Sequence, residues 1–237
     1  MSNQFTIDGL VVPFKEGESI MDAALAAGVY IPHLCHNPEF YPHGSCRLCT
    51  VNVNGRPVTA CTTPASANAK VENETHEINT RRRLLLKMLF VEGNHVCPAC
   101  EKSGNCQLQA VAYHCSMLAP EFTHFYPRRQ IDASHTETVI DFNRCILCEL
   151  CVRASRDVDD KNVFAISGRG IEAHLVINSP SGKLRDSAFH SDDKAAHVCP
   201  VGAILPKHKG YDVPIGERLY DRESISLVGD VAQHEEE

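Results

Sequence analysis

Three regularly spaced cysteines, Cys145, Cys148 and Cys151, are the densest group of reactive side chains in the sequence. Thiolates at this spacing are typical ligands of a [4Fe-4S] cluster, and the usual ferredoxin pattern adds a nearby fourth cysteine followed by proline. That position holds Ser155, and the cysteine that precedes a proline is Cys199 instead. Because the near ligand is missing, Cys199 most simply completes the same set. The pattern therefore predicts one [4Fe-4S] cluster and not two.

A second cysteine group near the N-terminus has the spacing of a plant-type [2Fe-2S] site. Its members are Cys35, Cys46, Cys49 and Cys61. The nearby histidines His33, His36 and His43 make a Rieske centre, with two histidine ligands, the alternative. Such a centre should show Cys-x-His pairs, and none is present. We therefore predict an all-cysteine set and interpret the histidines as loop or interface residues.

A third group provides only three sulfurs, from Cys97, Cys100 and Cys106. A cubane cluster needs a fourth ligand, for which His95 and Cys115 are the two candidates. We favour His95 because it belongs to the same loop and because imidazole can ligate a cluster iron. Cys115 lies nine residues beyond Cys106 on an expected helix, which is typical of a buried free thiol.

Composition restricts the classes of function. The 237-residue chain has a formal net charge of −7 and a pI near 6.0, which gives no support for nucleic-acid binding. No apolar run approaches the ~20 residues of a membrane span, and the N-terminus lacks the features of a secretory signal peptide. We therefore expect a cytoplasmic protein. Disulfides are rare in that compartment, so twelve cysteines favour cluster ligation, with structural zinc as the alternative.

The segments that must position the N-terminal ligands indicate an α+β fold. An Asp-Gly turn separates two short strands, and a helix capped by Ser19 ends at Gly28. An Asn-Gly turn joins a further predicted hairpin, so that Cys61 falls at a strand end. The expected strands cover residues 4–7, 10–14, 50–53 and 58–61. This pattern predicts a β-grasp plant-type ferredoxin domain over residues 1–78.

The following segment is expected to be helical. Residues 62–79 are polar and small and are interpreted as a linker or an edge strand. A helix is expected over residues 81–91, capped by Thr80, with its basic run 81–83 in solvent. Its inward side chains are expected to be Leu84, Leu85, Met88 and Leu89. Together with a helix over 107–118, this predicts a small helical cluster segment with one histidine and three cysteines over residues 79–119.

The Cys145 group is expected between a short strand over 139–142 and a helix over 150–158. A hairpin over 163–177 and a segment over 192–198 then lead to Cys199. Residues 120–210 are therefore predicted to form a bacterial-ferredoxin-like [4Fe-4S] domain. Residues 211–237 carry no ligand pattern and are expected to be a tail, with its acidic end at 235–237 frayed.

Motifs for other chemistry were not found. No G-x-G-x-x-G follows an expected strand, and the sequence contains neither a P-loop nor a Ser/His/Asp elbow. It also lacks paired Cys-x2-Cys motifs near both ends of the chain, of the kind that hold nickel in hydrogenases. We therefore expect a one-electron carrier without a catalytic centre of its own.

The order of the three motifs resembles the N-terminal part of the large iron–sulfur subunit of respiratory complex I, and the accessory domains of iron-only hydrogenases. The resemblance covers residues 1–210 and implies one [2Fe-2S] cluster followed by two [4Fe-4S] clusters. It implies three ligand sets: Cys35, Cys46, Cys49 and Cys61; Cys97, Cys100 and Cys106 with a histidine; and Cys145, Cys148, Cys151 and Cys199. The chain departs from the family in one place. The family's His-x3-Cys spacing would require a histidine at Gly93, whereas His95 gives His-x-Cys.

A chain of this length further resembles the small diaphorase subunits (gamma, or U) of cytoplasmic NAD-reducing [NiFe]-hydrogenases. That resemblance implies an electron relay between a partner subunit that binds FMN and NAD and the small and large hydrogenase subunits. The reaction of that family is H2 + NAD+ = NADH + H+. The alternatives are the iron–sulfur subunit of a complex I-like enzyme or of an NAD-dependent formate dehydrogenase, and a freestanding ferredoxin-like carrier.

Overall fold

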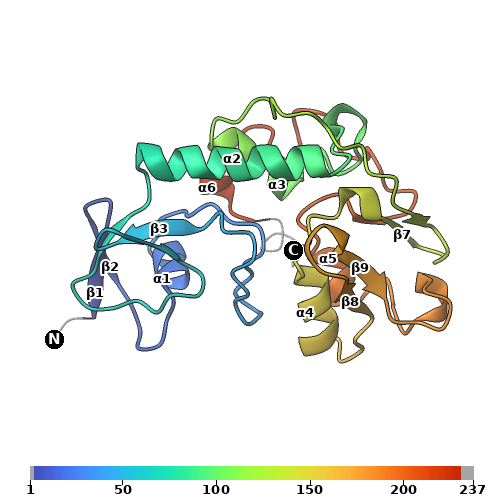
Figure 1. Cartoon of the computed structure of the whole chain (residues 1–237), viewed down its shortest axis with the longest axis horizontal. Coiled ribbons are helices and arrows are strands. Elements are labelled where there is room, and N and C mark those ends of the chain that lie inside the picture. Colours follow the sequence, from blue (N-terminus) through green and yellow to red (C-terminus); the bar gives the residue numbers. More distant parts are fainter. Residues whose placement is uncertain (1–2, 231–237) are drawn as a thin grey trace.

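The computed structural model describes residues 3–230, which form two lobes bridged by one long helix (Figure 1). The N-terminal lobe contains a mixed sheet and the helix α1 (Ile20–Ala26). The C-terminal lobe contains two small antiparallel sheets and the helices α4 (Leu150–Asp157) and α5 (Lys194–His197). The bridging helix, α2 (His76–Glu92), runs along both lobes. The α+β prediction is confirmed.

Five strands form the N-terminal sheet in the order β2-β1-β5-β3-β4. Their bounds are Gln4–Ile7 (β1), Leu10–Pro13 (β2), Thr50–Val53 (β3), Arg56–Thr59 (β4) and Lys70–Glu72 (β5). β5 pairs parallel to β1 and antiparallel to β3, so it is the central strand. The prediction of a linker or an edge strand over 62–79 is therefore wrong. A strand of three residues is too short to show the alternation that marks a strand in a sequence.

Local signals determine the first turns of the N-terminal lobe as predicted. Asp8 and Gly9 both have positive φ, at 48° and 88°, which is the conformation of a tight hairpin turn. The Ser19 hydroxyl accepts a hydrogen bond of 3.0 Å from the Asp22 amide and caps α1. The sheet and α1 enclose an apolar core that includes the fully buried Cys49. This cysteine is thus part of the core that stabilises the lobe.

The bridging helix differs from its prediction at its start and on its buried face. Its cap is Thr75, whose hydroxyl accepts a hydrogen bond of 3.2 Å from the Ile78 amide, and not Thr80. The predicted inward residues Leu84 and Met88 are 45% and 48% exposed. The helix instead buries Ile78, Arg82, Leu86 and Val91. Arginine counts as polar in an apolar periodicity, so the sequence pattern could not predict that the side of α2 that carries Arg82 is buried.

Arg82 anchors α2 to the loop of the N-terminal cysteines. It is 1% exposed, so the prediction of a solvated basic run is wrong for this residue. Its guanidinium donates to the main-chain oxygens of Leu48 at 3.1 Å and Thr50 at 3.3 Å, on either side of Cys49. It also forms an ion pair of 3.3 Å with Glu74. The helix and the ligand loop are therefore held by one buried side chain.

We expect Arg82→Met to destabilise the N-terminal lobe by about 3–5 kcal/mol, because loss of the buried guanidinium leaves the main-chain oxygens that it binds without a donor. Urea unfolding followed by circular dichroism measures the loss. The matched control is Arg81→Met, which removes a neighbouring exposed arginine paired with Glu77 at 2.6 Å. A surface pair of this kind contributes about 0.3–0.5 kcal/mol. Equal losses in the two variants would contradict the anchoring role.

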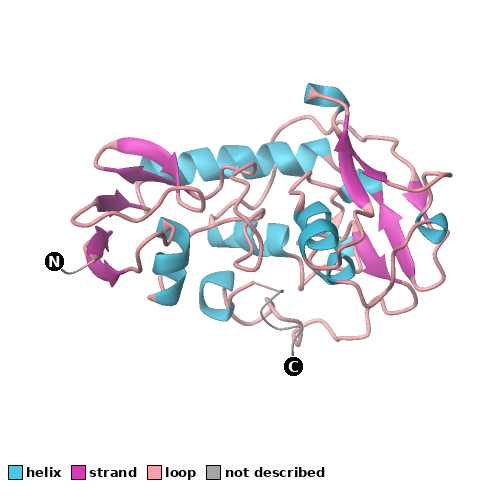
Figure 2. Ribbon diagram, turned by 90° about the horizontal axis from the view of Figure 1, so that it is seen from below, coloured by secondary structure: helices cyan, strands magenta, loops and turns pink. Residues whose placement is uncertain are grey.

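The C-terminal lobe is assembled from short elements, and the sheets of the two lobes lie at opposite ends of the molecule (Figure 2). One sheet has the order β10-β7-β6, and a separate hairpin pairs β8 with β9. The strands are Ile131–Asp132 (β6), Thr138–Asp141 (β7), Phe164–Ser167 (β8), His174–Ile177 (β9) and Ile204–Pro206 (β10). The other helices described are α3 (Gln107–His114), α6 (Ile225–Val228) and the 3-10 helices η1 (Cys97–Ala99), η2 (Phe142–Arg144), η3 (Gly170–Glu172) and η4 (Leu184–Asp186).

The segment up to residue 230 packs on the rest of the chain. α6 lies against α3, and Asp230 accepts a hydrogen bond of 2.9 Å from Gln107 Nε2. Asp230 also lies 2.6 Å from His33 Nε2. Burial alone would lower the pKa of His33, but the Asp230 carboxylate and the hydrogen-bonded Ile31 carbonyl together raise that pKa to about 9. The end that was expected to be frayed, 235–237, lies outside the described residues.

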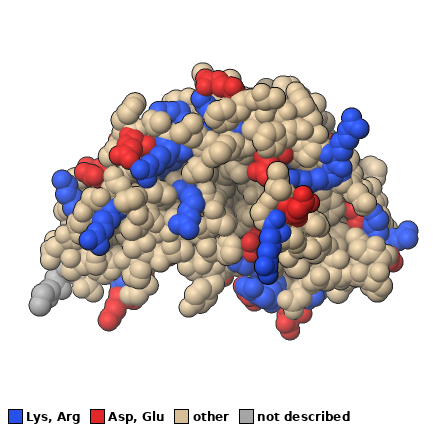
Figure 3. Space-filling view, viewed as in Figure 1, with Lys and Arg blue, Asp and Glu red and all other residues tan. Residues whose placement is uncertain are grey.

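Charged side chains of both signs are spread over the face shown in Figure 3. That face therefore carries no continuous basic stripe of the kind that binds nucleic acid. Within residues 3–230, none of the helices has both the length and the hydrophobicity required to cross a bilayer.

Candidate iron–sulfur cluster sites

The four cysteines of the N-terminal set come together in two pairs. The Sγ atoms of Cys49 and Cys61 are 3.4 Å apart, and the Cys35 and Cys46 thiols are hydrogen-bonded to each other. Two thiolates on one tetrahedral metal, with bonds of about 2.3 Å, are separated by roughly 3.8 Å, so each pair fits one iron. The hydrogen bond from the Cys46 thiol lowers the pKa of Cys35 to about 4. The Cys46 amide also donates to Cys35 Sγ, at 3.5 Å.

Each of the three histidines beside this set faces a carboxylate. The pairs are His33–Asp230 at 2.6 Å, His36–Asp22 at 3.0 Å and His43–Glu149 at 3.1 Å. A Rieske arrangement would need two of these rings in place of two sulfurs. The structure brings the four cysteines together without a histidine among them.

The middle set lies between the end of α2 and the start of α3. Cys97 begins η1, Cys100 follows its end, and Cys106 directly precedes α3. Their sulfurs and the His95 ring line one small cavity. Burial, reinforced by Arg144, lowers the pKa of His95 to about 4, so the imidazole is neutral at pH 7, as a metal ligand must be. Its Nε2 is buried and has no hydrogen-bond partner among the described residues.

The path of the His95 loop explains the departure from the family spacing. A Cβ built at Gly93 would lie 2.6 Å from His95 Nε2 and 3.0 Å from the main-chain oxygen of Asn143. The ring therefore folds back over residue 93, and it packs on Phe90 with ring centroids 5.6 Å apart. The imidazole thus occupies the space beside the residue at which the family carries its histidine.

Cys115 does not face the middle cavity. It directly follows α3 and packs, 6% exposed, in the apolar cluster that includes Leu86 and Leu108. The charges that act on its thiol are those of Arg82 and Arg83, in the first half of α2, and of Glu74, which precedes the cap of that helix. The structure brings His95, and not Cys115, to the three sulfurs.

We expect the Cys115 thiol of the folded protein to resist alkylation at pH 8. Burial raises its pKa to about 11, so that only about one thiol in a thousand is ionised at pH 8. Its labelling rate should rise about tenfold for each pH unit up to that pKa, because the thiolate is the nucleophile. Iodoacetamide labelling read by peptide mass spectrometry measures this rate. Fast labelling at pH 8 without unfolding would contradict the buried placement.

The C-terminal set is built on a turn whose backbone alternates in conformation. Leu147 and Glu149 have φ of 54° and 60°, on either side of Cys148. Turns of this kind direct backbone N–H groups at an anion. The amides of Leu147 and Leu150 accordingly donate to the sulfurs of Cys145 and Cys148. The four sulfurs of Cys145, Cys148, Cys151 and Cys199 line one cavity.

Ser155, at the position of the missing ferredoxin cysteine, faces away from this cavity. Its Oγ accepts a hydrogen bond of 2.8 Å from the Val163 amide, and the residue is 1% exposed. The serine therefore ties α4 to the segment that leads into β8. Cys199, which follows α5, enters the cavity from the other side.

The C-terminal set lies between the other two sets in space. Cys35 of the N-terminal set belongs to the same buried cluster as Cys148. On the other side, the Gln107 amide, directly after the last middle cysteine, donates at 2.9 Å to the carbonyl of Pro200, directly after Cys199. The spatial order is thus N-terminal, C-terminal and middle, which differs from the order along the chain.

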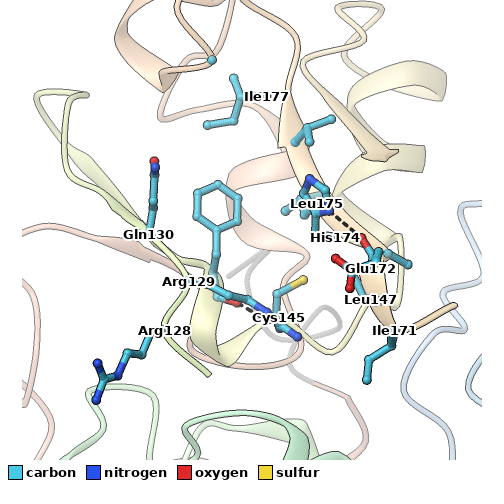
Figure 4. Close-up of a pocket in the computed structure, with 14 residues that line it drawn as sticks. Arg128, Arg129, Gln130, Cys145, Leu147, Ile171, Glu172, His174, Leu175 and Ile177 are labelled. Atoms are coloured by element: carbon cyan, nitrogen blue, oxygen red, sulfur yellow. Dashed lines mark hydrogen bonds between the residues drawn. The ribbon is translucent and has the colours of Figure 1, made fainter. Parts of the chain in front are cut away.

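An open cavity of about 510 Å³ adjoins the C-terminal set (Figure 4). Arg128 and Arg129 line one side of it and β9 the other, and Cys145 forms part of its wall. Sequence reasoning did not identify this cavity, because its residues come from separate segments that share no motif. Cys145, a candidate cluster ligand, therefore lies close to a surface opening.

Comparison with known proteins identifies the family. Residues 3–76 match a 2Fe-2S iron-sulfur cluster binding domain, residues 82–119 the NADH-ubiquinone oxidoreductase-G iron-sulfur binding region, and residues 138–205 a 4Fe-4S single cluster domain. The chain is 41% identical over 226 residues to the NAD-reducing hydrogenase HoxS subunit gamma of Cupriavidus necator, covering 95% of this chain and 96% of that protein. The chain belongs to the gamma-subunit family of NAD-reducing hydrogenases. The family expected from the sequence is confirmed.

A solved structure and more distant relatives also match the chain. A chain in the crystal structure of an NAD+-reducing [NiFe]-hydrogenase in the H2-reduced state matches with a TM-score of 0.94 and 50% identity, covering 97% of this chain and 98% of that one. The alpha subunit of the NADPH-Fe(3+) oxidoreductase of Geobacter sulfurreducens is 33% identical over 204 residues, covering 85% of this chain but 24% of that protein. The NADH-ubiquinone oxidoreductase 78 kDa subunit of Candida albicans is 30% identical over 215 residues, covering 86% and 28%. The expected relation to complex I is confirmed.

Proposed function

We propose that this chain is the electron-relay subunit of a cytoplasmic NAD-reducing [NiFe]-hydrogenase and carries one [2Fe-2S] and two [4Fe-4S] clusters. The four N-terminal cysteines hold the first cluster, His95 and the three middle cysteines the second, and the C-terminal set the third. The observation that carries this assignment is the His95 imidazole. It is neutral, buried beside three sulfurs, and its Nε2 has no hydrogen-bond partner among the described residues.

The chain's own residues contribute position and electrostatics. When bound, the clusters supply one-electron transfer. Backbone amides donate to sulfurs in the N-terminal and C-terminal sets, and such hydrogen bonds favour the reduced, more negative state. His95 is neutral where a thiolate is anionic, so it should raise the potential of the middle cluster relative to an all-cysteine cluster in similar surroundings.

The spatial order of the sets supports a relay from the N-terminal set through the C-terminal set to the middle set. A partner subunit that binds FMN and NAD would exchange hydride with NAD, and the small and large [NiFe]-hydrogenase subunits would exchange electrons with H2. The chain described here would connect the two as a conductor without a catalytic centre of its own. This spatial order determines the path, because an electron passes only between clusters that are neighbours in space.

Iron and acid-labile sulfide assays on protein purified without air test the cluster assignment. We expect about ten irons per chain, whereas structural zinc in the same sites would give roughly two or three zincs and no sulfide. Electron paramagnetic resonance of the dithionite-reduced chain then counts the clusters. Co-purification from the native source tests the partners. Recovery as a lone monomer, or with a formate dehydrogenase, would contradict the hydrogenase assignment.

A further inference from the structure

Arg153, on α4, is a buried arginine between the N-terminal and C-terminal sets. It is 3% exposed. Its Nη2 donates to the carbonyl of Cys35 at 2.5 Å and to that of Cys148 at 3.4 Å. Its Nη1 donates to the carbonyl of Tyr41 at 2.9 Å, and its Nε to that of Glu149 at 3.3 Å. One side chain therefore links the two ligand loops at the ligand residues themselves.

Arg153 forms no hydrogen bond or ion pair with a carboxylate in the part of the chain that the structure describes, and the exposed Asp157, one turn later on α4, acts on it only through its charge. Its four hydrogen-bond acceptors are all main-chain oxygens, and none of the ion pairs within residues 3–230 includes it. Its other close neighbour is the Phe40 ring, whose centroid is 5.8 Å from the guanidinium carbon. Arginine stays charged when it is buried. A buried charge held only by main-chain oxygens is strongly unfavourable, and a solvent-exposed carboxylate offsets little of that cost, so we expect a second negative group to act on it.

Two other arginines that contact the ligand segments do have carboxylate partners. Arg82 pairs with Glu74 at 3.3 Å, and Arg144, beside the middle set, pairs with Glu101 at 2.8 Å. The contrast indicates that the counter-charge of Arg153 comes from the two sets that it links. Thiolate-ligated clusters in those sets would carry that negative charge.

We propose that Arg153 is a positioning residue shared by two clusters. Its guanidinium holds the N-terminal and C-terminal ligand loops against each other, and its charge raises the reduction potentials of both clusters. A fixed positive charge favours the reduced form because reduction adds negative charge to the cluster. The inference rests on the proposed cluster assignment. It adds a residue that sets the potentials of the two clusters between which the first electron transfer within the chain occurs.

Redox titration of the full chain, purified without air and followed by electron paramagnetic resonance, tests the proposal. In Arg153→Gln we expect the potentials of the [2Fe-2S] and C-terminal [4Fe-4S] clusters to become more negative, with the middle potential unchanged. The matched control is Arg156→Gln, three residues later on the same helix. Arg156 is 52% exposed in its side chain and pairs with Asp157 at 2.6 Å, so its removal should leave all three potentials unchanged.

Unaltered potentials in Arg153→Gln, or an equal shift of all three, would overturn the inference. If that variant loses its clusters, Arg153→Lys carries the test because it keeps the charge. Clusters that are retained at unshifted potentials in Arg153→Lys, beside their loss in Arg153→Gln, would support the role of charge, and lowered potentials of the two flanking clusters in Arg153→Lys would overturn it. A lack of iron and sulfide in the unaltered chain would refute the proposed function instead, so the two failures are distinguishable.

Discussion

Replacement of Cys148 by alanine is expected to stop electron transfer through the chain, because the C-terminal set lies between the other two. The variant should lose one [4Fe-4S] cluster, which lowers the iron content from about ten to about six per chain. Cys148 is 9% exposed and lines the cavity of its set, and Ser155 is turned toward Val163, so it cannot supply a replacement ligand. In the assembled complex, H2-driven NAD+ reduction should fall to the background rate.

Partial reactions distinguish a broken relay from a misfolded complex. Dye reduction by NADH at the flavin subunit and dye reduction by H2 at the hydrogenase subunits should both persist in Cys148→Ala. The matched control is Cys115→Ser, which removes a buried thiol that lines none of the three sets. It should keep all clusters and the full coupled activity. Coupled activity that survives in Cys148→Ala would contradict the central position of the C-terminal set.

Replacement of His95 by alanine is expected to remove the middle cluster alone. The cavity would then offer three sulfurs and no fourth ligand, since Cys115 packs elsewhere. Iron should again fall to about six per chain. The paramagnetic signal of the middle cluster should disappear, and the two others should remain. Electron transfer to the hydrogenase subunits should be lost while NADH can still reduce the first two clusters.

The choice between the two candidate ligands follows from the same measurements. Cys115→Ser should leave the middle signal unchanged, because Cys115 does not line the cavity that His95 and the three middle cysteines share. The opposite pattern, with the signal intact in His95→Ala and lost in Cys115→Ser, would show that the histidine is not the ligand.

Much of the candidate site could be predicted because cluster ligation depends on local spacing. Cysteines two residues apart, as in Cys145, Cys148 and Cys151, place their sulfurs on one turn whatever the rest of the chain does. Caps and tight turns are local in the same way, so the hairpin at Asp8 and the cap at Ser19 were predicted correctly. The order of the three cysteine motifs, on which the family resemblance depends, can likewise be read from cysteine positions alone.

Contacts between distant segments could not be predicted. β5 is a central strand because β1 and β3 pair with it, and not because of any pattern within its three residues. Arg82 and Arg153 look like ordinary surface arginines in the sequence. In the structure both are buried and donate hydrogen bonds to main-chain oxygens of loops that are distant in the sequence. Periodicity describes one element at a time and therefore cannot show which partner will cover a polar side chain.

The sequence by itself determined which residues are candidate cluster ligands, because the covalent chain limits how far apart neighbouring sulfurs can lie. Only the tertiary structure decided how the three sets are arranged. It placed the C-terminal set between the others, turned His95 over Gly93 and put Arg153 between two ligand loops. The positions of the C-terminal set and of Arg153 depend on packing between segments that are distant along the chain, such as Cys35 and Arg153, about which local spacing carries no information.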